Sequence, residues 1–302
     1  MGSGIIMKPA KQKAYLFLFL MSVAVLFVTA FELKLLQSEL LIKRMEAEEI
    51  DYDRFRNLML KEDILDQAED RSSEVIKQEP YLKNMPFSDE IGYLTFSMMA
   101  SAYDLNKKPL IDKNTFCRGI GRLAENTGFK ELYGYCRAVM KDLTYFPVPK
   151  MAEGAADIAY EDTWGQPRTY GGDRKHEGTD LMASNNQRGY FPVISITDGT
   201  VEKLGWLEQG GNRIGIRSAC GGYFYYAHLY SYAPELKQGD TVIAGQLLGF
   251  MGDSGYGKEG TIGQFAVHLH LGIYVNSPDG EMSVNPFWIL KILENKRVYY
   301  KN

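Results

Sequence analysis

An uncharged apolar run near the N-terminus constrains this chain more than any other feature of its sequence. Residues 14–31 read AYLFLFLMSVAVLFVTAF, 18 residues without a single charge. At 1.5 Å per helical residue, this run is just long enough to cross the hydrocarbon core of a bilayer. The lysines within residues 1–13 favour a cytoplasmic N-terminus before a transmembrane anchor. We therefore expect a single-pass membrane protein whose remainder lies on the extracytoplasmic side.

A cleaved signal peptide is the alternative interpretation of the same run. Val28, Thr29 and Ala30 resemble the small-residue cleavage site of such peptides. The apolar run is longer than the usual signal core, which favours the retained anchor. In either case the large C-terminal portion is exported, and secretion after cleavage is the alternative to anchoring.

The composition is that of a folded protein without a basic surface. Of 302 residues, 45% are hydrophobic and 24% are charged, with a formal net charge of −4 and a pI of about 5.7. Lysines and arginines are dispersed among acids, so no nucleic-acid partner is expected. Cys117 and Cys136 are able to pair in an exported segment, but spacing leaves open whether they form a disulfide or remain buried thiols.

Residues 32–80 are rich in charged residues with an apolar stripe at helical spacing. Leu33, Leu36 and Leu40 begin the stripe, and no proline or glycine interrupts it before Pro80. The pattern predicts one long helical stalk. Its heptads are too irregular to require a coiled coil, but the stalk offers a surface for a homodimer or a protein partner.

Beyond the stalk the pattern of residue types changes twice. Residues 81–146 predict a small helical module, and Pro147 and Pro149 mark its boundary with residues 150–302. In that last part, alternating β-branched and aromatic residues between glycine-rich turns predict an all-β sandwich or barrel-like sheet. The candidate strands are Gly199–Trp206, Arg213–Arg217, Tyr223–His228, Gln246–Met251 and Phe265–Val275, with a closing helix from Pro286 to Lys296.

All four histidines of the chain lie in three short motifs of this β-rich part. These motifs are HEGTD with His176 and Asp180, YYAHLY with His228, and HLH with His268 and His270. Residues two apart on a strand share a face, so His268 and His270 project side by side. On an extended segment His176 and Asp180 also share a face, and imidazole with carboxylate is a sensible zinc-ligand pair. The motifs together predict a metal or acid–base site.

In order and approximate spacing, the three motifs resemble those of the zinc endopeptidases related to lysostaphin, the LytM or M23 family. The segment DTWGQPR at 162–168 and the turn GDSG at 252–255 resemble further parts of the same pattern. The resemblance covers about residues 155–285 and implies a mainly β catalytic domain with an antiparallel sheet, preceded by the transmembrane helix and the helical stalk and module. Residues 32–150 lie outside it.

The resemblance also implies roles for individual residues. His176, Asp180 and His270 become ligands of Zn²⁺, while His228 and His268 become catalytic. Which of these two is the general base stays open. Tyr170 corresponds to a tyrosine that stabilises the transition state in some members, and packing at the rim of the cleft is the alternative.

The implied activity is hydrolysis of peptide bonds in bacterial cell-wall peptidoglycan by metal-activated water. No residue indicates which bond is cut, and glycine bridges and stem peptides that contain D-amino acids both stay open. Some members of the family have lost ligands and act as catalytically silent scaffolds or activators of other cell-wall or sporulation proteins. Because all three ligands and both catalytic histidines are present here, the active enzyme is the expectation.

Overall fold

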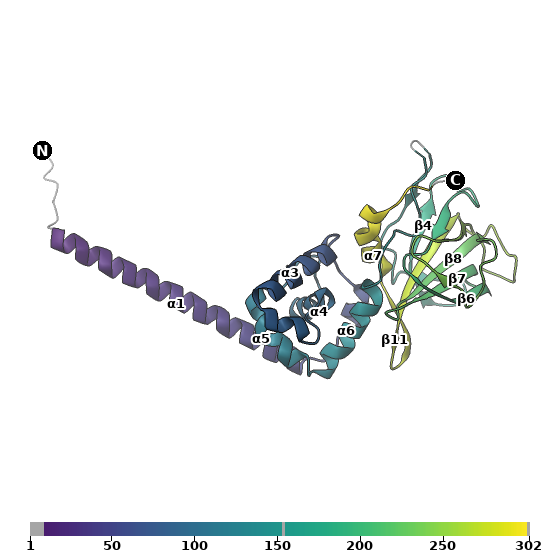
Figure 1. Ribbon diagram of the computed structural model, residues 1–302. Helices are drawn as coiled ribbons and strands as arrows, with labels where there is room; N and C mark the ends of the chain where they lie inside the picture. The colour runs from purple at the N-terminus through teal and green to yellow at the C-terminus, as the bar shows by residue number, and fades with distance from the viewer. Residues whose placement is uncertain (1–8, 153–154, 301–302) are drawn as a thin grey trace, which may run out of the picture. The chain divides into compact units, whose positions relative to one another are not determined.

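The computed structural model describes residues 9–152 and 155–300 of the chain (Figure 1). By their internal contacts, the residues form two compact units, Met1–Glu48 and Glu49–Asn302. Lys8 and most of the expected cytoplasmic segment lie outside the described residues.

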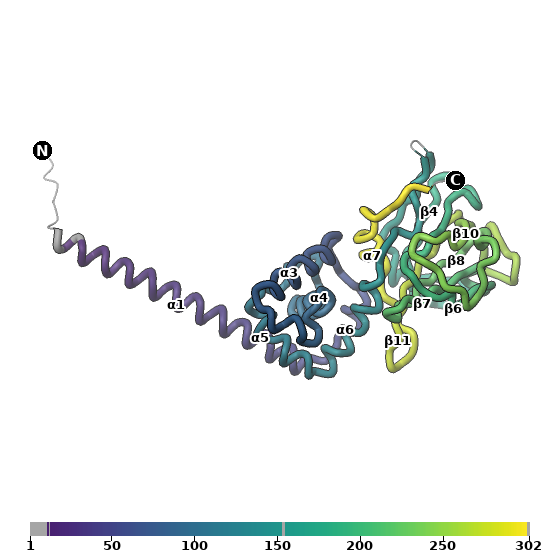
Figure 2. Tube along the Cα trace, viewed as in Figure 1, coloured from purple at the N-terminus to yellow at the C-terminus, as the bar shows by residue number. Residues whose placement is uncertain are grey.

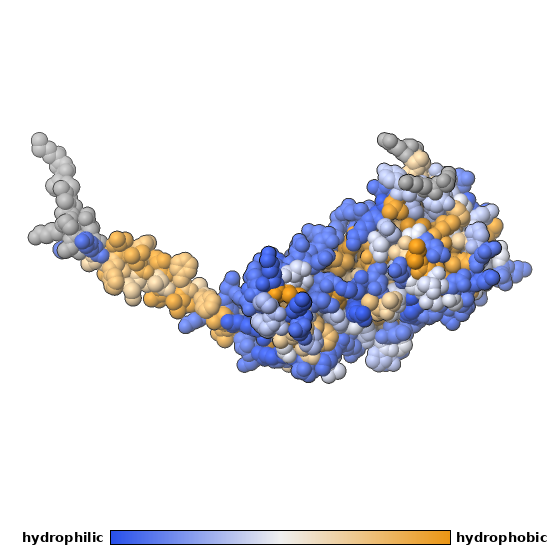
Figure 3. Space-filling view, viewed as in Figure 1, coloured by the Kyte–Doolittle hydropathy of each residue, from blue (hydrophilic) through white to orange (hydrophobic). Residues whose placement is uncertain are grey.

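The first unit is dominated by helix α1, which spans Pro9–Ala47. Its apolar side chains between Tyr15 and Phe31 are exposed, and they form the continuous orange surface of the helix in Figure 3. Among the described residues, the stretch Lys13–Ala47 is the one helix that is long and apolar enough to cross a membrane. A signal sequence near the N-terminus can have the same length and apolar composition, so both alternatives from the sequence stand.

The prediction of a single long helix over residues 32–80 is wrong beyond Ala47, where α1 ends. The chain leaves the helix there, and Asp51 caps a short new helix, α2 (Tyr52–Asn57), by accepting a hydrogen bond from the backbone of Arg54. Leu58 then adopts a left-handed conformation (φ 48°) that ends α2. The apolar residues in this region are therefore core residues of the second unit, since Phe55 and Leu58 are buried.

The N-terminal part of the second unit is a helical module. It consists of α3 (Ile64–Gln78), the 3₁₀ turn Pro80–Asn84, α4 (Glu90–Ala100), α5 (Lys113–Leu123) and α6 (Thr127–Met140). Helix α3 turns one apolar face, which includes Ile64, Ala68 and Val75, into the module and packs against α4. Asp112 and Asn126 cap α5 and α6, each accepting hydrogen bonds from the first-turn backbone.

The C-terminal part is an antiparallel sheet, which confirms the expected fold class. Its main strand order is β1-β4-β11-β8-β7-β6-β9, with β12 paired to β11 and with β10 paired to β5 and β8. A separate small ribbon consists of β2 and β3. The strands are β1 (Ile158–Ala159), β2 (Pro167–Arg168), β3 (Arg174–Lys175), β4 (Thr179–Ala183), β5 (Pro192–Ile194), β6 (Gly199–Leu207), β7 (Gly211–Ser218), β8 (Tyr223–Tyr232), β9 (Thr241–Val242), β10 (Leu247–Met251), β11 (His268–Ser277) and β12 (Gly280–Val284). All five candidate strands are present, and the closing helix is α7 (Pro286–Leu293) followed by a 3₁₀ turn (Glu294–Lys296).

The helical module and the sheet are joined by specific polar contacts. Arg56 of α2 donates from Nε to the Ser283 carbonyl oxygen (2.9 Å) and from Nη2 to Ser283 Oγ (3.0 Å). Its own carbonyl accepts from Asn285 at 2.8 Å. The C-terminal segment, yellow in Figure 2, returns to the start of the β-rich part, where Lys150 exchanges backbone hydrogen bonds with Val298 and Tyr300.

The three cysteines are free in the structure. Cys136 is completely buried, with its Sγ 3.9 Å from Met98 Sδ, and burial raises the pKa of its thiol to about 12. Cys117 and Cys136 therefore do not form a disulfide in this structure.

Candidate active site

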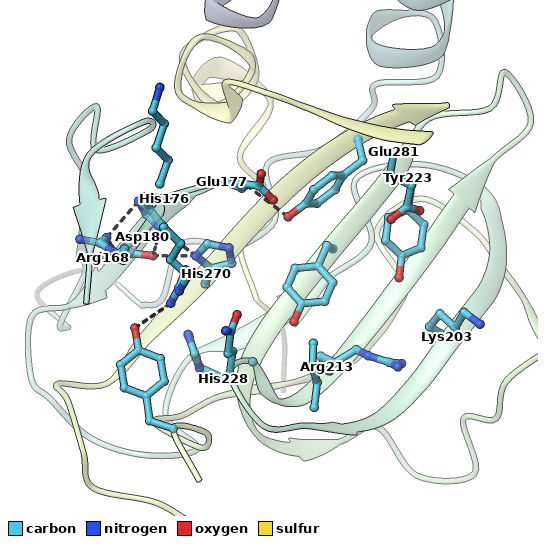
Figure 4. Close-up of a pocket in the computed structure, with 18 of the residues that line it drawn as sticks. Arg168, His176, Glu177, Asp180, Lys203, Arg213, Tyr223, His228, His270 and Glu281 are labelled. Carbon is cyan, nitrogen blue, oxygen red and sulfur yellow. Dashed lines mark hydrogen bonds and ion pairs between the residues drawn. The ribbon is translucent and has the colours of Figure 1, made fainter. Parts of the chain in front are cut away.

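A row of side chains crosses the sheet where β4, β11 and β8 run side by side. In the strand register, His270 of β11 lies opposite Asp180 of β4 on one side and opposite Ala227 of β8 on the other. Directly opposed residues point to the same face of a sheet. The register therefore places His270 and Asp180 together, and the chain segment after β3 adds His176 (Figure 4).

Three donor atoms converge at this point. His176 Nε2 lies 2.9 Å from His270 Nδ1 and 3.1 Å from Asp180 Oδ1, and His270 Nδ1 lies 2.9 Å from the same oxygen. Ligand atoms of these three residues all lie within 4.8 Å of one another. Two imidazole nitrogens and one carboxylate oxygen make a donor set that suits Zn²⁺ and leaves a position for water or substrate. The residues present thus fit the metal that the sequence predicts.

The two other histidines lie beside this cluster and present one particular nitrogen to it. His268 Nδ1 lies 2.7 Å from the carbonyl oxygen of Ala266, and His228 Nδ1 lies 2.8 Å from that of Ser254. A carbonyl oxygen only accepts, so each Nδ1 carries the hydrogen and each neutral ring keeps Nε2 free to accept a proton. The ring centroids lie 4.7 Å apart, and His268 Nε2 is 3.7 Å from Asp180 Oδ1.

A β-bulge brings His228 to this face of the sheet. Strict alternation along β8 would direct His228 to the same side as Tyr226, which is completely buried in the core. The register between β7 and β8 shifts at this place, and His228 adopts a left-handed conformation with φ 64°. The extra residue places Ala227 and His228 on the same face. A non-glycine residue in this region is strained, which is common at functional sites.

Burial controls the charge of the cluster. It lowers the pKa of His228 well below 6.5, and it lowers the pKa of His268 and His270 as well. Burial alone would raise the pKa of Asp180, but hydrogen bonds from His176 and His270 outweigh it and hold the pKa of this carboxyl far below its usual value. These groups therefore favour neutral imidazoles beside an ionised carboxylate, the protonation states that metal ligation requires.

Two residues that support the cluster lie within motifs that the sequence analysis quoted, although neither was predicted as a site residue. Arg168, at the end of DTWGQPR, donates from Nη2 to Asp180 Oδ2 at 2.7 Å and so fixes the second oxygen of this carboxylate. Gly178, within HEGTD, lies so close to His270 that a Cβ there would fall 2.4 Å from His270 Cε1. Its absent side chain is a packing requirement, visible only once β4 is paired with β11.

Tyr170 reaches the site through a second tyrosine. Its ring stacks on that of Tyr256 with centroids 4.1 Å apart and planes 1° apart, and its hydroxyl lies 3.2 Å from Glu208 Oε1. Tyr256 lines the cleft, and its ring centroid lies 6.0 Å from that of His228. Glu177 is exposed at the cleft edge and does not belong to the donor cluster.

The cluster lies in a cleft of about 590 Å³ that continues across the sheet. Besides the four histidines and Asp180, its lining includes Tyr223, Tyr225, Tyr274, Lys203 and Arg213. An open cleft beside a metal-ligand set and two proton acceptors has the layout of a hydrolytic site for an extended substrate.

Comparison with known proteins agrees with this geometry. Residues 174–286 match the sequence model of Peptidase family M23. The crystal structure of a lytM protein from Ruminococcus gnavus ATCC 29149, assigned as a glycyl-glycine endopeptidase, is 40% identical to this chain with a TM-score of 0.66. The alignment covers 86% of this chain and 98% of that one. The chain belongs to peptidase family M23.

Curated relatives of this M23 peptidase cover less of the chain. The L-Ala–D-Glu endopeptidase of Bacillus subtilis (strain 168) is 43% identical over 149 residues, which is 49% of this chain and 43% of that protein. Lysostaphin of Staphylococcus simulans is 36% identical over 102 residues, 33% of this chain and 19% of its own length. The matched region is thus less than half of either relative, and family membership confirms the resemblance that the histidine motifs predict.

Proposed function

We propose that this M23 peptidase is a zinc-dependent endopeptidase that hydrolyses peptide bonds in bacterial peptidoglycan. The observation that carries the proposal is that two of the four histidines belong to the cluster of donor atoms and the other two lie beside it. Three donor atoms, on His176, Asp180 and His270, converge on one point. His228 and His268 lie outside this donor set, and their Nδ1 atoms are engaged by backbone carbonyls, which leaves Nε2 of each to exchange protons. The B. subtilis and S. simulans relatives support peptidoglycan as the substrate class.

In this proposal His176, Asp180 and His270 hold the metal, and Arg168 keeps the carboxylate of Asp180 in place. When bound, Zn²⁺ lowers the pKa of a water ligand towards about 7 and polarises the carbonyl of the scissile bond. The hydrogen bond from Arg168 to Asp180 fits this role, because hydrogen bonds to the outer atoms of metal ligands orient them.

His228 and His268 transfer the proton of the attacking water. Either Nε2 is able to accept the proton of the attacking water, because both rings are neutral and burial lowers their pKa. The proton is then delivered to the nitrogen of the leaving amine, and the ring returns to its neutral state. The Nδ1 hydrogen bonds to Ser254 and Ala266 persist throughout and keep each ring in one tautomer. Tyr170 acts in this scheme through its stack with Tyr256 at the rim of the cleft.

The exposed apolar surface of α1 supports a location at the cell membrane. In the proposed arrangement residues 1–13 are cytoplasmic, residues 14–31 span the bilayer, and the peptidase domain at 150–302 lies on the extracytoplasmic side with its polymer. Removal of α1 as a signal sequence is the alternative, and the size of the protein isolated from cell membranes distinguishes the two.

The test is the zinc-dependent release of new amino groups from purified peptidoglycan by the full-length protein in detergent. We expect release that a chelator abolishes and zinc restores. His270→Ala should lose stoichiometric zinc and activity together, and an unchanged metal content would refute the ligand assignment. No release by fully zinc-loaded protein would overturn the enzyme and favour the silent scaffold.

A further inference from the structure

One guanidinium in the cleft, that of Arg213, has a buried nitrogen without a hydrogen-bond partner. Arg213 lies on β7 and shares the cleft with the histidines. Its Nη1 is buried without a hydrogen-bond partner, and no ion pair involves its guanidinium among residues 9–152 and 155–300. A buried guanidinium nitrogen without an acceptor is unfavourable in a resting protein. The arrangement suits an acceptor that arrives with the substrate.

The strand register places Arg213 next to the catalytic row. Its neighbour Ile214 is completely buried in the core, so Arg213 points to the cleft face. On β8 the residues opposite Arg213 are those of the bulge that carries His228. The order β11-β8-β7 puts Arg213 two strands from His270, which is roughly 10 Å at normal strand spacing. Figure 4 shows Arg213 on the far side of His228 from His176 and Asp180.

The two acidic residues at this end of the cleft, Glu202 and Glu281, already pair with another arginine. Arg217, four residues further along the same face of β7, pairs with Glu202 at 2.6 Å and with Glu281 at 3.6 Å. Lys203 of β6 also lines this end of the cleft and adds positive charge beside Arg213. Tyr225 lines the same cleft, and its ring centroid lies 6.0 Å from that of His270.

We infer that Arg213 binds a free carboxylate of the substrate, so that the cleft selects stem peptides with an acidic residue beside the scissile bond over glycine bridges. A span of roughly 10 Å corresponds to about three residues of extended peptide, and the reach of the side chain brings the carboxylate closer still. Guanidinium binds carboxylate with two parallel hydrogen bonds, which gives both affinity and orientation. A glycine bridge has no side chain that could supply this partner. The inference rests on the proposed function and deepens it.

The experiment compares three defined peptides with full-length, zinc-loaded protein: L-Ala-γ-D-Glu-L-Lys-D-Ala, the same peptide with the glutamate carboxylate converted to carboxamide, and pentaglycine. We expect the highest kcat/KM for the first. Arg213→Gln should lower it by about 10- to 100-fold, the loss expected for a charged hydrogen bond, and should leave the carboxamide peptide nearly unchanged. Arg213→Lys should fall between wild type and Arg213→Gln, because it keeps the charge without the bidentate geometry.

Arg217→Gln is the matched control, since it removes an arginine from the same face of the same strand that is already paired within the protein. It should affect the acidic and amidated peptides equally. Equal rates on all three peptides, or an equal loss on both stem peptides in Arg213→Gln, would overturn the inference and leave the endopeptidase intact.

If no peptide is cleaved, that outcome counts against the proposed hydrolytic activity alone. Peptide binding measured by calorimetry then tests the role of Arg213. Tighter binding of the carboxylate peptide than of the carboxamide, lost in Arg213→Gln, supports the role of Arg213 in an inactive protein. Equal binding of the two peptides overturns it.

Discussion

Gly178→Ala tests whether the close approach of β4 to β11 builds the metal site. The new Cβ would lie 2.4 Å from His270 Cε1, 2.5 Å from the Leu271 carbonyl oxygen and 2.6 Å from His270 Nε2. Ordinary contact begins near 3.4 Å, so the strands or the imidazole must move apart by about 1 Å. The backbone oxygen belongs to a strand that is paired on both sides, which leaves the His270 ring to move.

The consequence should be a larger loss in metal binding than in folding. Overpacking costs about 1–3 kcal/mol of unfolding free energy, whereas a displacement of about 1 Å in a positioned group can cost about 100-fold in function. We expect Gly178→Ala to bind zinc at least about tenfold more weakly in a chelator competition, with peptidoglycan hydrolysis reduced in parallel.

The matched control is Gly134→Ala in helix α6, where a Cβ would meet nothing within 4 Å. This change should leave zinc binding unaltered and stabilise the helix by up to about 1 kcal/mol. Wild-type zinc affinity and stability in Gly178→Ala would refute the reasoning, because they would mean that β4 and β11 do not approach as closely as the structure has them.

Three further changes separate proton transfer, ligand support and folding. His228→Ala should keep one zinc per chain but lower kcat by about 10²- to 10⁴-fold, and loss of the metal would contradict its separation from the ligands. Arg168→Met removes the partner of Asp180 Oδ2 and should weaken zinc binding by about 10- to 100-fold in a chelator competition; unchanged affinity would assign Arg168 to packing alone. Gly222→Ala would put a Cβ 2.1 Å from the Ala138 carbonyl oxygen of helix α6 and should cost about 1–3 kcal/mol in chemical unfolding, while zinc stoichiometry stays at that of the wild type.

Several parts of the molecule could be predicted because their signals are local. Alternation and glycine-rich turns identified the five main strands, since a strand with one buried face repeats every two residues. Helical spacing was a less complete guide between residues 32 and 80. The apolar stripe there correctly indicated helices, but the break after Ala47 depends on Phe55 and Leu58 packing into the second unit, which a one-dimensional pattern does not contain.

The sequence by itself determined the chemistry available to this protein: an apolar segment long enough for a membrane, a sheet-forming C-terminal half, and the residue types of the proposed zinc site. The tertiary structure decided which atoms meet. Only strand pairing sets His270 opposite Asp180, only the bulge in β8 turns His228 away from the core, and only the order of β8 and β7 brings Arg213 beside them. The physical reason is that residue identity fixes what a side chain can do. Long-range register and packing fix its partners, and a shift of one residue would send these groups to the opposite face of the sheet.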